Sequence, residues 1–271
     1  YSEAPPDTRL GDMLREMGIK ALYCHQQEAI AHIQAGRHVV VATPTASGKT
    51  LVYNLPVLER VLTHPDSRAL YLFPLKALAQ DQFRAFTEMA AECHGFAPSA
   101  AIYDGDTSAY RRKKIRETPP NVILTNPEMM HLAILPYHEK WAAFLSRLSF
   151  VVVDEVHTYR GILGSHIAQV IRRFRRMCRE YGADPTFIFS SATIGNPDQL
   201  STALTGLDVT PVLSAGAPEG RRHLLFMNPS DSPAHSAILL LKAALHRGLR
   251  TIVYCQSRKM TELIALWAGS Q

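Results

Sequence analysis

The residues best suited to chemistry lie in a short segment that can bind phosphate. The segment TPTASGKT (43–50) follows the apolar run HVVVAT (38–43) and precedes a helical pattern that opens with Lys49 and Thr50. In such a strand, loop and helix arrangement, backbone N–H groups cradle phosphates, the lysine reaches the β and γ phosphates, and the threonine ligates Mg²⁺. The residues predicted to bind ATP in this way are Thr45, Ala46, Ser47, Gly48, Lys49 and Thr50.

This segment departs from the strict phosphate-loop pattern G-x-x-x-x-G-K-[ST] at one position. Thr43 stands where the pattern has its first glycine. An ordinary helix N-terminus with an exposed Lys49 is the structural alternative for such a segment. A second motif is therefore needed to decide between the two interpretations.

A pair of adjacent carboxylates supplies that second motif. Asp154 and Glu155 end the apolar run FVVVDE (150–155), and the carboxyl ends of parallel strands are where ligands bind in open α/β folds. We predict that Asp154 holds Mg²⁺ together with Thr50, and that Glu155 polarises the water that attacks the γ phosphate. A helix N-cap is the alternative for such a pair. Combined with Lys49, the pair favours ATP hydrolysis, with Lys49, Asp154 and Glu155 as catalytic residues.

Short β-branched and aliphatic runs alternate with helical patterns along most of the chain. Continuous apolar strands, each followed by a helix, are typical of a parallel sheet that helices cover on both faces. The predicted strands are 38–43, 69–73, 99–103, 121–125, 150–155 and 186–193, and the predicted helices are 25–35, 50–63, 76–92, 108–117, 127–134, 164–181 and 197–204. The predicted fold class is therefore α/β.

The composition changes near residue 208 and predicts a domain boundary there. Residues 1–208, with a helical lead-in at 1–22, are predicted to form one nucleotide-binding domain. The Gly-, Pro- and Ser-rich segment 209–234 is predicted to be a linker with one strand at 221–227. The elements predicted for 235–271 are a helix at 235–247, a strand at 250–255 and a helix at 257–268. These elements are too few for a second complete α/β domain.

The composition is that of an ordinary soluble protein. Of the 271 residues, 46% are hydrophobic and 20% are charged, and the net charge of +5 mildly favours a polyanionic partner. No apolar run reaches the roughly 18 residues of a membrane span, and the first residues lack the order of a signal peptide, so we expect an intracellular protein with no membrane partner. The widely spaced cysteines predict neither a zinc site nor disulfides: Cys24, Cys93, Cys178 and Cys255.

The order of these motifs resembles that of superfamily 2 helicases of the DExH type: GKT, then DEVH (154–157), then SAT (191–193). The resemblance covers almost the whole chain and implies a RecA-like P-loop NTPase fold. It also implies that Gln26 reads adenine, with Tyr23 or Leu22 against the base, although an exposed helical glutamine is the alternative. Many helicases have glycine at the position of Ala46.

The same resemblance assigns a coupling role to three residues beside the nucleotide site. His157, Ser191 and Thr193 resemble the elements that link this site to a second domain and to DNA. The alternative for His157 is a core histidine with satisfied hydrogen bonds. The alternative for Ser191 and Thr193 is a strand end whose hydroxyls bond the local backbone.

Three further segments resemble the nucleic-acid-contacting motifs of the superfamily: FPLKAL (73–78), YDGDTS (103–108) and TNPEMM (125–130). At the carboxyl ends of strands they would hold single-stranded nucleic acid by its phosphates. The predicted contact residues are Pro74, Lys76, Gly105, Asp106, Thr125, Asn126 and Glu128. The basic runs RRKKIR (111–116) and RRFRRMCR (172–179) contact DNA or are solvated helix faces.

TPTASGKT, DEVHTYRGILGSH (154–166) and SSATIGNP (190–197) more closely resemble the bacterial mitomycin repair factor A family of DNA helicases. That resemblance implies single-stranded DNA as the partner, 3′ to 5′ movement, a role in DNA repair, and a place in the bacterial cytosol with the nucleoid. An RNA helicase or remodeller, or a P-loop ATPase switch that does not translocate, stays open, because phosphate contacts do not read the sugar. A packed helix start with Gly161 and Gly164 as turn residues is the alternative for YRGILGSH.

The resemblance also implies that the motor has a second half. In the superfamily, arginines from a second RecA-like domain close on the γ phosphate, and RTIVYCQSRKMTELI (250–264) resembles only the beginning of that domain. We therefore expect 235–271 to be the incomplete start of a second RecA-like domain. The expected partners are the remainder of the helicase core and its C-terminal region. The chain alone is expected to bind ATP and Mg²⁺ but to hydrolyse ATP poorly.

Overall fold

The computed structural model describes residues 2–3, 9–93, 97–218, 223–229 and 232–269. The chain divides into two compact units, Tyr1–Pro218 and Glu219–Gln271. The first unit contains a seven-stranded sheet, and the second contains two helices among its described residues.

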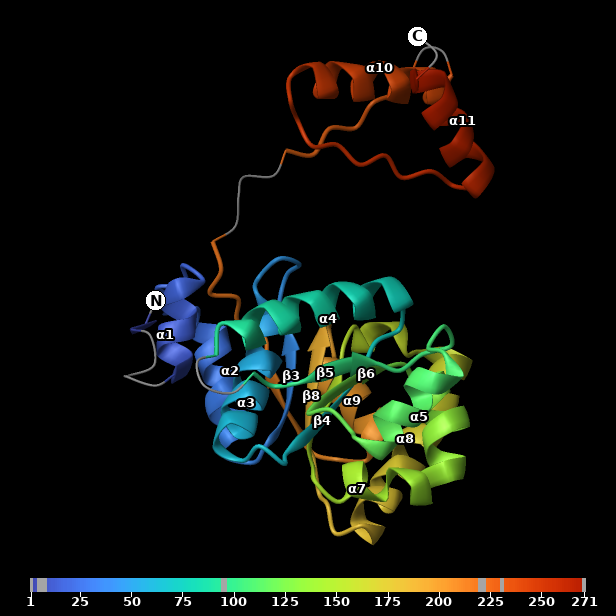
Figure 1. Cartoon of the computed structure of the whole chain (residues 1–271). Helices are drawn as coiled ribbons and strands as arrows, with labels where there is room; N and C mark the ends of the chain where they lie inside the picture. Colours follow the sequence, from blue (N-terminus) through green and yellow to red (C-terminus); the bar gives the residue numbers. More distant parts are fainter. Residues whose placement is uncertain (1, 4–8, 94–96, 219–222, 230–231, 270–271) are drawn as a thin grey trace. The chain divides into compact units, whose positions relative to one another are not determined.

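The sheet of the first unit is entirely parallel and has the strand order β5-β6-β4-β7-β8-β3-β9 (Figure 1). Its strands are β3 (His38–Ala42), β4 (Arg68–Leu72), β5 (Ala100–Ile102), β6 (Val122–Thr125), β7 (Leu148–Val153), β8 (Thr186–Ser191) and β9 (Val209–Val212). Val39, Val40 and Val41 of β3 are at most 1% exposed, as an internal strand of a sheet covered on both faces requires. The six strands predicted before residue 208 and the parallel α/β fold are confirmed.

Helices pack against both faces of this sheet (Figure 1). One buried cluster joins the sheet to α1 (Arg9–Glu16), α2 (Cys24–Gln34), α3 (Lys49–Thr63) and α4 (Lys76–Ala91). The other cluster joins it to α6 (Pro127–Met129), the turns Met130–Ile134 and Leu135–Trp141, α7 (Ala142–Leu145), α8 (Gly161–Glu180) and α9 (Pro197–Thr205). Helix α5 (Ala109–Glu117) buries none of its residues. The short strands β1 (Ser2–Glu3) and β2 (Ala21–Leu22) form a separate antiparallel pair.

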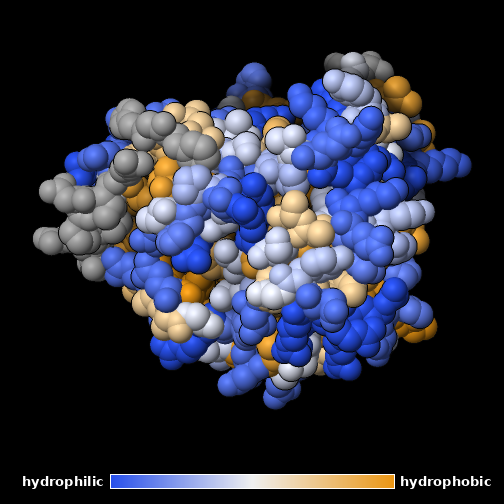
Figure 2. Space-filling model, turned by 60° about the horizontal axis from the view of Figure 1, so that its bottom comes forward, coloured by the Kyte–Doolittle hydropathy of each residue, from blue (hydrophilic) through white to orange (hydrophobic). Residues whose placement is uncertain are grey.

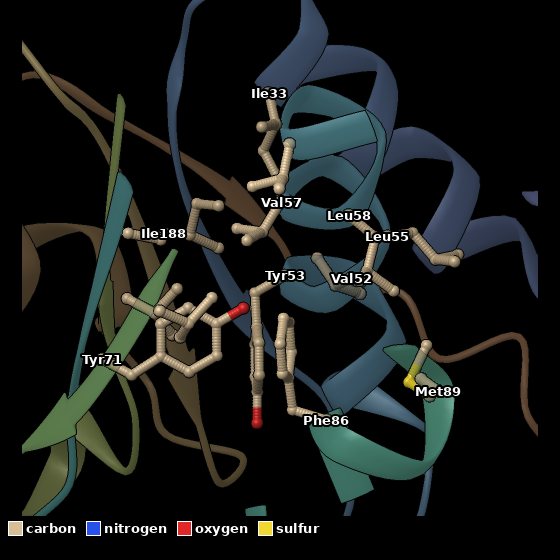
Figure 3. Packing of buried hydrophobic residues seen from close by; sticks show 14 of the residues in the cluster. Ile33, Val52, Tyr53, Leu55, Val57, Leu58, Tyr71, Phe86, Met89 and Ile188 are labelled. Atoms are coloured by element: carbon tan, nitrogen blue, oxygen red, sulfur yellow. The ribbon is translucent and has the colours of Figure 1, made fainter. Parts of the chain in front are cut away.

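Aromatic rings fill the layer between the sheet and α3 and α4 (Figure 3). The rings of Tyr53 and Tyr71 meet edge to face at 5.4 Å, and Tyr71 meets Phe86 at 6.2 Å. Each of these buried hydroxyls has a partner, because Tyr53 donates to Gln82 (2.9 Å) and Tyr71 donates to Asn54 (2.9 Å). The layer therefore fixes α3, and with it the N-terminal end of α3, where Lys49 and Thr50 lie.

The segment between α6 and β7 was not predicted to be helical beyond residue 134. It continues through a π-helical turn at Met130–Ile134 and a 3₁₀ segment at Leu135–Trp141. Trp141 is fully buried against Tyr103, with ring centroids 4.9 Å apart, and its Nε1 donates to Ala133 O. Burial of this indole over the sheet, not a regular apolar period, decides the local path.

Two predictions beyond residue 208 are wrong. Val209–Val212 belongs to the sheet as β9, although the linker was predicted to begin at 209; Pro211 is tolerated there because β9 is an edge strand. Residues 250–255 form no strand in the second unit, whose described helices are α10 (Pro233–His246) and α11 (Arg258–Gly269). A strand needs a neighbour to bond its backbone, and Ile252 remains 77% exposed. The strand predicted at 221–227 lies partly outside the described residues, and 223–227 is not a strand.

The face of the molecule in Figure 2 is largely hydrophilic, and its hydrophobic residues are scattered. Such isolated apolar side chains are normal on a folded surface. None of the helices in the described part of the chain is both long and apolar enough to cross a membrane.

Candidate nucleotide-binding site and adjoining loops

The phosphate loop leads from β3 into α3 through two residues with a left-handed backbone. Gly48, at the N-cap of α3, has a φ of 77°, and Ala46 has a φ of 63°. Glycine adopts this conformation at little cost, whereas a residue with a Cβ is strained by about 1 kcal/mol. The loop therefore needs contacts that hold this shape.

The first turn of α2 supplies two of these contacts. His25 Nε2 donates to Ser47 O at 3.1 Å, and Gln26 Nε2 donates to Gly48 O at 2.9 Å. The C=O and N–H of a trans peptide point in opposite directions. The amides of Gly48 and Lys49 are therefore directed away from α2. A set of N–H groups at a helix N-terminus, directed to one side, is suited to phosphate.

Thr43 stands at the position of the first glycine of the strict pattern and helps to hold the shape of the loop. Its hydroxyl shares a hydrogen bond of 2.7 Å with the Ser47 hydroxyl, which closes the loop across its base. The ammonium group of Lys49 donates to the carbonyls of Thr43 (2.8 Å) and Pro44 (2.9 Å). Burial lowers the pKa of Lys49, which makes an anionic partner for its ammonium group favourable.

The carboxylate pair lies at the end of β7, two strands from the phosphate loop. Asp154 is 7% exposed and accepts a hydrogen bond from the Ser190 hydroxyl of the neighbouring strand β8. Burial raises the pKa of Asp154 to about 6, and the adjacent carboxylate of Glu155 adds to the shift. Glu155 itself has a φ of 51°. A nearby cation would offset the cost of holding both carboxylates ionised.

The donor set fits Mg²⁺ better than a metal held by protein ligands alone. No group of three or more His, Cys, Asp or Glu side chains converges on one point among the described residues. Mg²⁺ typically takes one or two protein oxygens and completes its octahedron with water and phosphate oxygens. Asp154 and Thr50, which line the same cleft, would supply those protein oxygens.

A single cleft of about 1180 Å³ brings most of the predicted site together. The predicted nucleotide and catalytic residues that line it are Thr45, Ala46, Ser47, Gly48, Lys49, Thr50, Asp154, Glu155 and His157. Pro74, Asn126 and Glu128, predicted to contact nucleic acid, line the same cleft. The cleft is therefore shared between the GKT and DEVH segments and two of the three loops that resemble nucleic-acid motifs.

His157 connects the DEVH segment to the SAT segment. Its Nδ1 is 3.2 Å from the Ala192 amide, which can donate to it, and 3.1 Å from Glu155 Oε2. One ring nitrogen cannot accept from the amide and donate to the carboxylate at once, so the two contacts exclude each other. The Ser191 hydroxyl is buried with no partner among the described residues, and Thr193 is exposed. The coupling role of these three residues stays a prediction.

Tyr23 and Gln26 lie beside the phosphate loop, not within the main cleft. Gln26 is 2% exposed, so the alternative of an exposed helical glutamine is wrong. Its Oε1 accepts from the Tyr23 amide at 2.8 Å, and the Tyr23 ring stacks on the His25 ring with centroids 5.8 Å apart. The contact of both residues with adenine stays a prediction.

The loops that follow β4 and β5 are joined by an exposed ion pair. Lys76 Nζ lies 2.8 Å from Asp106 Oδ2, and this pair raises the pKa of Lys76. The loop of Gly105 and Asp106 is shaped by Asp104, whose buried carboxylate accepts from the amides of Asp106 and Thr107. Lys76, Gly105 and Asp106 are all exposed, and so remain accessible to a ligand.

The predicted residues after β6 divide into structural and accessible ones. Thr125 is 1% exposed and donates to Tyr103 O at 2.5 Å. Asn126 caps α6 by accepting from the Met129 amide at 2.8 Å. Glu128 is exposed beside them. Side-chain contact with nucleic acid is therefore open to Glu128, while Thr125 and Asn126 hold the shape of the loop.

The two basic runs are used partly within the fold. In α5, Arg112 donates to Asp104 O at 2.8 Å, and Arg116 donates to the Tyr103 hydroxyl at 3.3 Å. In α8, Arg172 and Arg175 donate to the carbonyls Ala203 O and Thr205 O near the end of α9. Cations at a helix C-terminus are favourable because of its carbonyl partial charge.

Sequence analysis missed two residues at this site. His25 lies next to Gln26 but resembled any helical histidine, because its partners are distant in sequence. Tyr159 is 2% exposed and lines the cleft, and its hydroxyl has no partner among the described residues. A Cβ at Gly164 would lie 2.5 Å from Tyr159 O, which explains the glycine in YRGILGSH as a site of close packing.

A parallel sheet with a GKT loop and a carboxylate pair at the ends of nearby strands defines a RecA-like P-loop NTPase. The model of the DEAD/DEAH box helicase family matches residues 23–200, and the chain belongs to this family.

Several relatives are similar over most of the chain. An uncharacterized ATP-dependent helicase of Bacillus subtilis, YprA, is 46% identical over 267 residues, covering 95% of this chain and 35% of the relative. The ATP-dependent helicase HRQ1 of Saccharomyces cerevisiae is 40% identical over 256 residues, covering 89% of this chain and 24% of the relative. The chain thus spans about a third or less of these two relatives.

Solved structures agree with this assignment. The crystal structure of the DUF1998 helicase MrfA bound to DNA is 44% identical, with a TM-score of 0.93, and the match covers 99% of this chain and 39% of that one. A second MrfA structure, bound to DNA and AMPPNP, is 45% identical, with a TM-score of 0.92, covering 97% and 38%. The resemblance to the mitomycin repair factor A family is therefore confirmed, and the RecA-like fold with it.

Proposed function

We propose that this chain is the ATP-binding part of an ATP-dependent DNA helicase that moves 3′ to 5′ on single-stranded DNA and acts in DNA repair. The single observation that carries the proposal is the cleft that holds Lys49, Asp154 and Glu155 together with Pro74, Asn126 and Glu128. The relatives support it, because they are named ATP-dependent helicases and the MrfA structures contain DNA. A bacterial cytosolic protein associated with the nucleoid would fit this role.

ATP hydrolysis at this site would rest on positioning and charge. The amides of Gly48 and Lys49 would bind phosphate oxygens, and the Lys49 ammonium would turn from the Thr43 and Pro44 carbonyls to the β and γ phosphates. Thr50 and Asp154 would hold Mg²⁺, which supplies charge neutralisation to phosphoryl transfer. Glu155 would orient the attacking water and accept its proton.

Adenine recognition would fall to the first turn of α2. Gln26 already bonds Gly48 O, so a base held by its amide and by the Tyr23 ring would lie next to the phosphate loop. Gln26 Nε2 bonds the Gly48 carbonyl and would lie 2.6 Å from a Cβ added at Gly48. A rearrangement of the Gln26 side chain would therefore act directly on the phosphate loop. His157, Ser191 and Thr193 would pass the state of the site to the rest of the motor.

DNA would cross the loops at the carboxyl edge of the sheet. The exposed residues Lys76, Gly105, Asp106 and Glu128, with the loop at Pro74 after β4 and the loop at Thr125 and Asn126 at the end of β6, would hold its backbone by amides and side chains. Residues 235–271 would begin the second RecA-like domain, after a linker that starts beyond β9. The remainder of the helicase core and its C-terminal region would complete the motor.

Magnesium-dependent ATPase activity tests this proposal. The activity is measured for this chain and for a form extended through a second RecA-like domain, each with and without single-stranded DNA or RNA. We expect strong DNA stimulation in the extended form only. Glu155→Gln should lower that rate by about 10²- to 10⁴-fold while nucleotide binding stays. Glu180→Gln, a change of an exposed carboxylate on α8, is the matched control. ATPase activity indifferent to nucleic acid would leave a P-loop switch, and preference for RNA would favour an RNA remodeller.

A further inference from the structure

The buried imidazole of His25 joins two parts of the first unit that are far apart in sequence. Its ring is fully buried, with 0% of the residue exposed. Nε2 lies 3.1 Å from Ser47 O of the phosphate loop, and Nδ1 lies 3.2 Å from the amide nitrogen of Gly216. Gly216 follows β9 and comes two residues before Pro218, the last residue of the first unit.

The two partners determine which ring nitrogen carries the proton. A carbonyl oxygen only accepts, so Nε2 must carry hydrogen toward Ser47. A backbone amide only donates, so Nδ1 must be bare toward Gly216. His25 is therefore neutral and in the Nε2–H form. Burial lowers the pKa of His25 and so favours this neutral form.

Close packing at Gly216 shows that the junction has a specific shape. A Cβ added at Gly216 would lie 2.4 Å from Cys24 Sγ and 3.0 Å from the Cys24 amide nitrogen. The second of these atoms is backbone at the start of α2, so it cannot move aside cheaply. Residues 213–218 are called the exit segment below. Cys24 thus leaves room only for glycine at position 216 of this segment.

We propose that His25 is a positioning residue that tethers the phosphate loop to the exit segment, so that nucleotide occupancy changes how firmly residues 213–218 are held. The inference rests on the proposed function in one respect, because it requires nucleotide to bind the loop. Ser47 O is on the peptide whose N–H belongs to Gly48, and that N–H is directed toward the predicted phosphate side. A phosphate that reorients this peptide therefore also moves the carbonyl that His25 holds.

Four substitutions separate the halves of the tether. Asn places a polar atom near the position of Nδ1, so His25→Asn keeps an acceptor for Gly216 and loses the donor to Ser47. Gln reaches the position of Nε2, so His25→Gln keeps the donor to Ser47 and loses the acceptor. His25→Phe removes both. Gly216→Ala breaks the junction from its other side. His246→Asn, on the exposed end of α10, is the control.

Hydrogen–deuterium exchange of a peptide covering 212–218 tests the tether, with and without Mg²⁺ and AMPPNP, alongside titration with a fluorescent ATP analogue. Without nucleotide, exchange at residue 216 should accelerate about fivefold in His25→Phe, His25→Gln and Gly216→Ala, and stay near wild type in His25→Asn and His246→Asn. With nucleotide, exchange of this peptide should change in the wild type by a factor of two or more. This response should be absent in His25→Asn and His25→Gln alike, although both remain folded.

Each outcome decides between the tether and the proposed function. Unchanged exchange at Gly216 in the nucleotide-free His25→Phe protein overturns the tether. A nucleotide response that survives in both His25→Asn and His25→Gln also overturns it, even if nucleotide affinity falls. Failure of the wild type to bind the ATP analogue defeats the proposed function instead, and the nucleotide-free exchange then still decides whether His25 joins the two segments.

Discussion

The phosphate loop and the loops after β4 and β5 lie at the same edge of one sheet but are held in different ways. The phosphate loop is fixed by contacts from His25, Gln26 and Thr43, and the half-buried Lys49 and the buried Asp154 lie beside it. The other loops are exposed, and one ion pair on the surface, Lys76 with Asp106, joins them. A loop predicted to bind the phosphates of a nucleotide is held in shape before the nucleotide binds. A surface predicted to bind single-stranded nucleic acid instead has exposed side chains whose ion pairs can exchange with phosphates.

The largest effect should follow from removing the charge at the preorganised end. Lys49→Ala removes the ammonium that bonds Thr43 O and Pro44 O and that would bind the phosphates. Affinity for ATP with Mg²⁺ should fall by roughly 10- to 100-fold, as expected for charge-assisted hydrogen bonds. Isothermal titration measures this. Lys20→Ala, at an exposed position, is the control, and equal affinity of the two variants would contradict the assignment.

Acid should weaken magnesium binding at the same end. The pKa of Asp154 is raised to about 6 by burial, with Glu155 adding to it, so the folded protein favours the protonated carboxyl. Since this pKa lies above that of an unfolded aspartate, about 3.9, the metal-free fold loses stability as the pH rises from about 4 to about 6. Mg²⁺ requires the ionised form, so Mg²⁺ affinity in the presence of ATP should fall about tenfold per unit below pH 6. Titration from pH 7.5 to pH 5 checks this, and Asp154→Asn should weaken the dependence to the part that protonation of ATP itself causes.

A moderate effect is expected where the exchangeable contact is removed. Asp106→Asn frees Lys76 from its ion partner and removes a negative charge from the predicted DNA path. Affinity for single-stranded DNA at low salt should rise by roughly twofold to fivefold. Fluorescence anisotropy with a labelled oligonucleotide measures it, and Asp81→Asn on the exposed face of α4 serves as control. A fall in affinity would mean that Asp106 holds the loop in its binding shape.

The smallest effect concerns strain in the preorganised loop. Ala46 has a φ of 63°, which glycine adopts more easily. Ala46→Gly relieves this strain but adds freedom to the unfolded chain, so the free energy of unfolding should change by less than about 1 kcal/mol. Gly48→Ala at the neighbouring left-handed position should destabilise the protein more, since its Cβ would lie 2.6 Å from Gln26 Nε2. Urea unfolding of both variants compares them, and the reverse order would contradict the role given to α2.

Much of the first unit follows from local pattern. Continuous apolar runs predicted six of its seven sheet strands, because a strand buried on both faces has apolar residues at every position. β9 was missed, because VTPV is short, contains a proline and follows the turn at Gly206. The strand predicted at 250–255 failed for the opposite reason: its pattern is strong, but the described residues provide no neighbour.

The sequence by itself indicated the chemistry at the site: a lysine and threonine after a loop of small residues, and two carboxylates after an apolar strand, have few other uses together. Only the tertiary structure decided which side chains are free to act. Thr125 is held within the fold by Tyr103, Gln26 is buried against Gly48, and His25 bridges Ser47 and Gly216. These contacts join residues up to 191 positions apart, and no local pattern encodes a hydrogen bond whose partners meet only when the sheet is assembled.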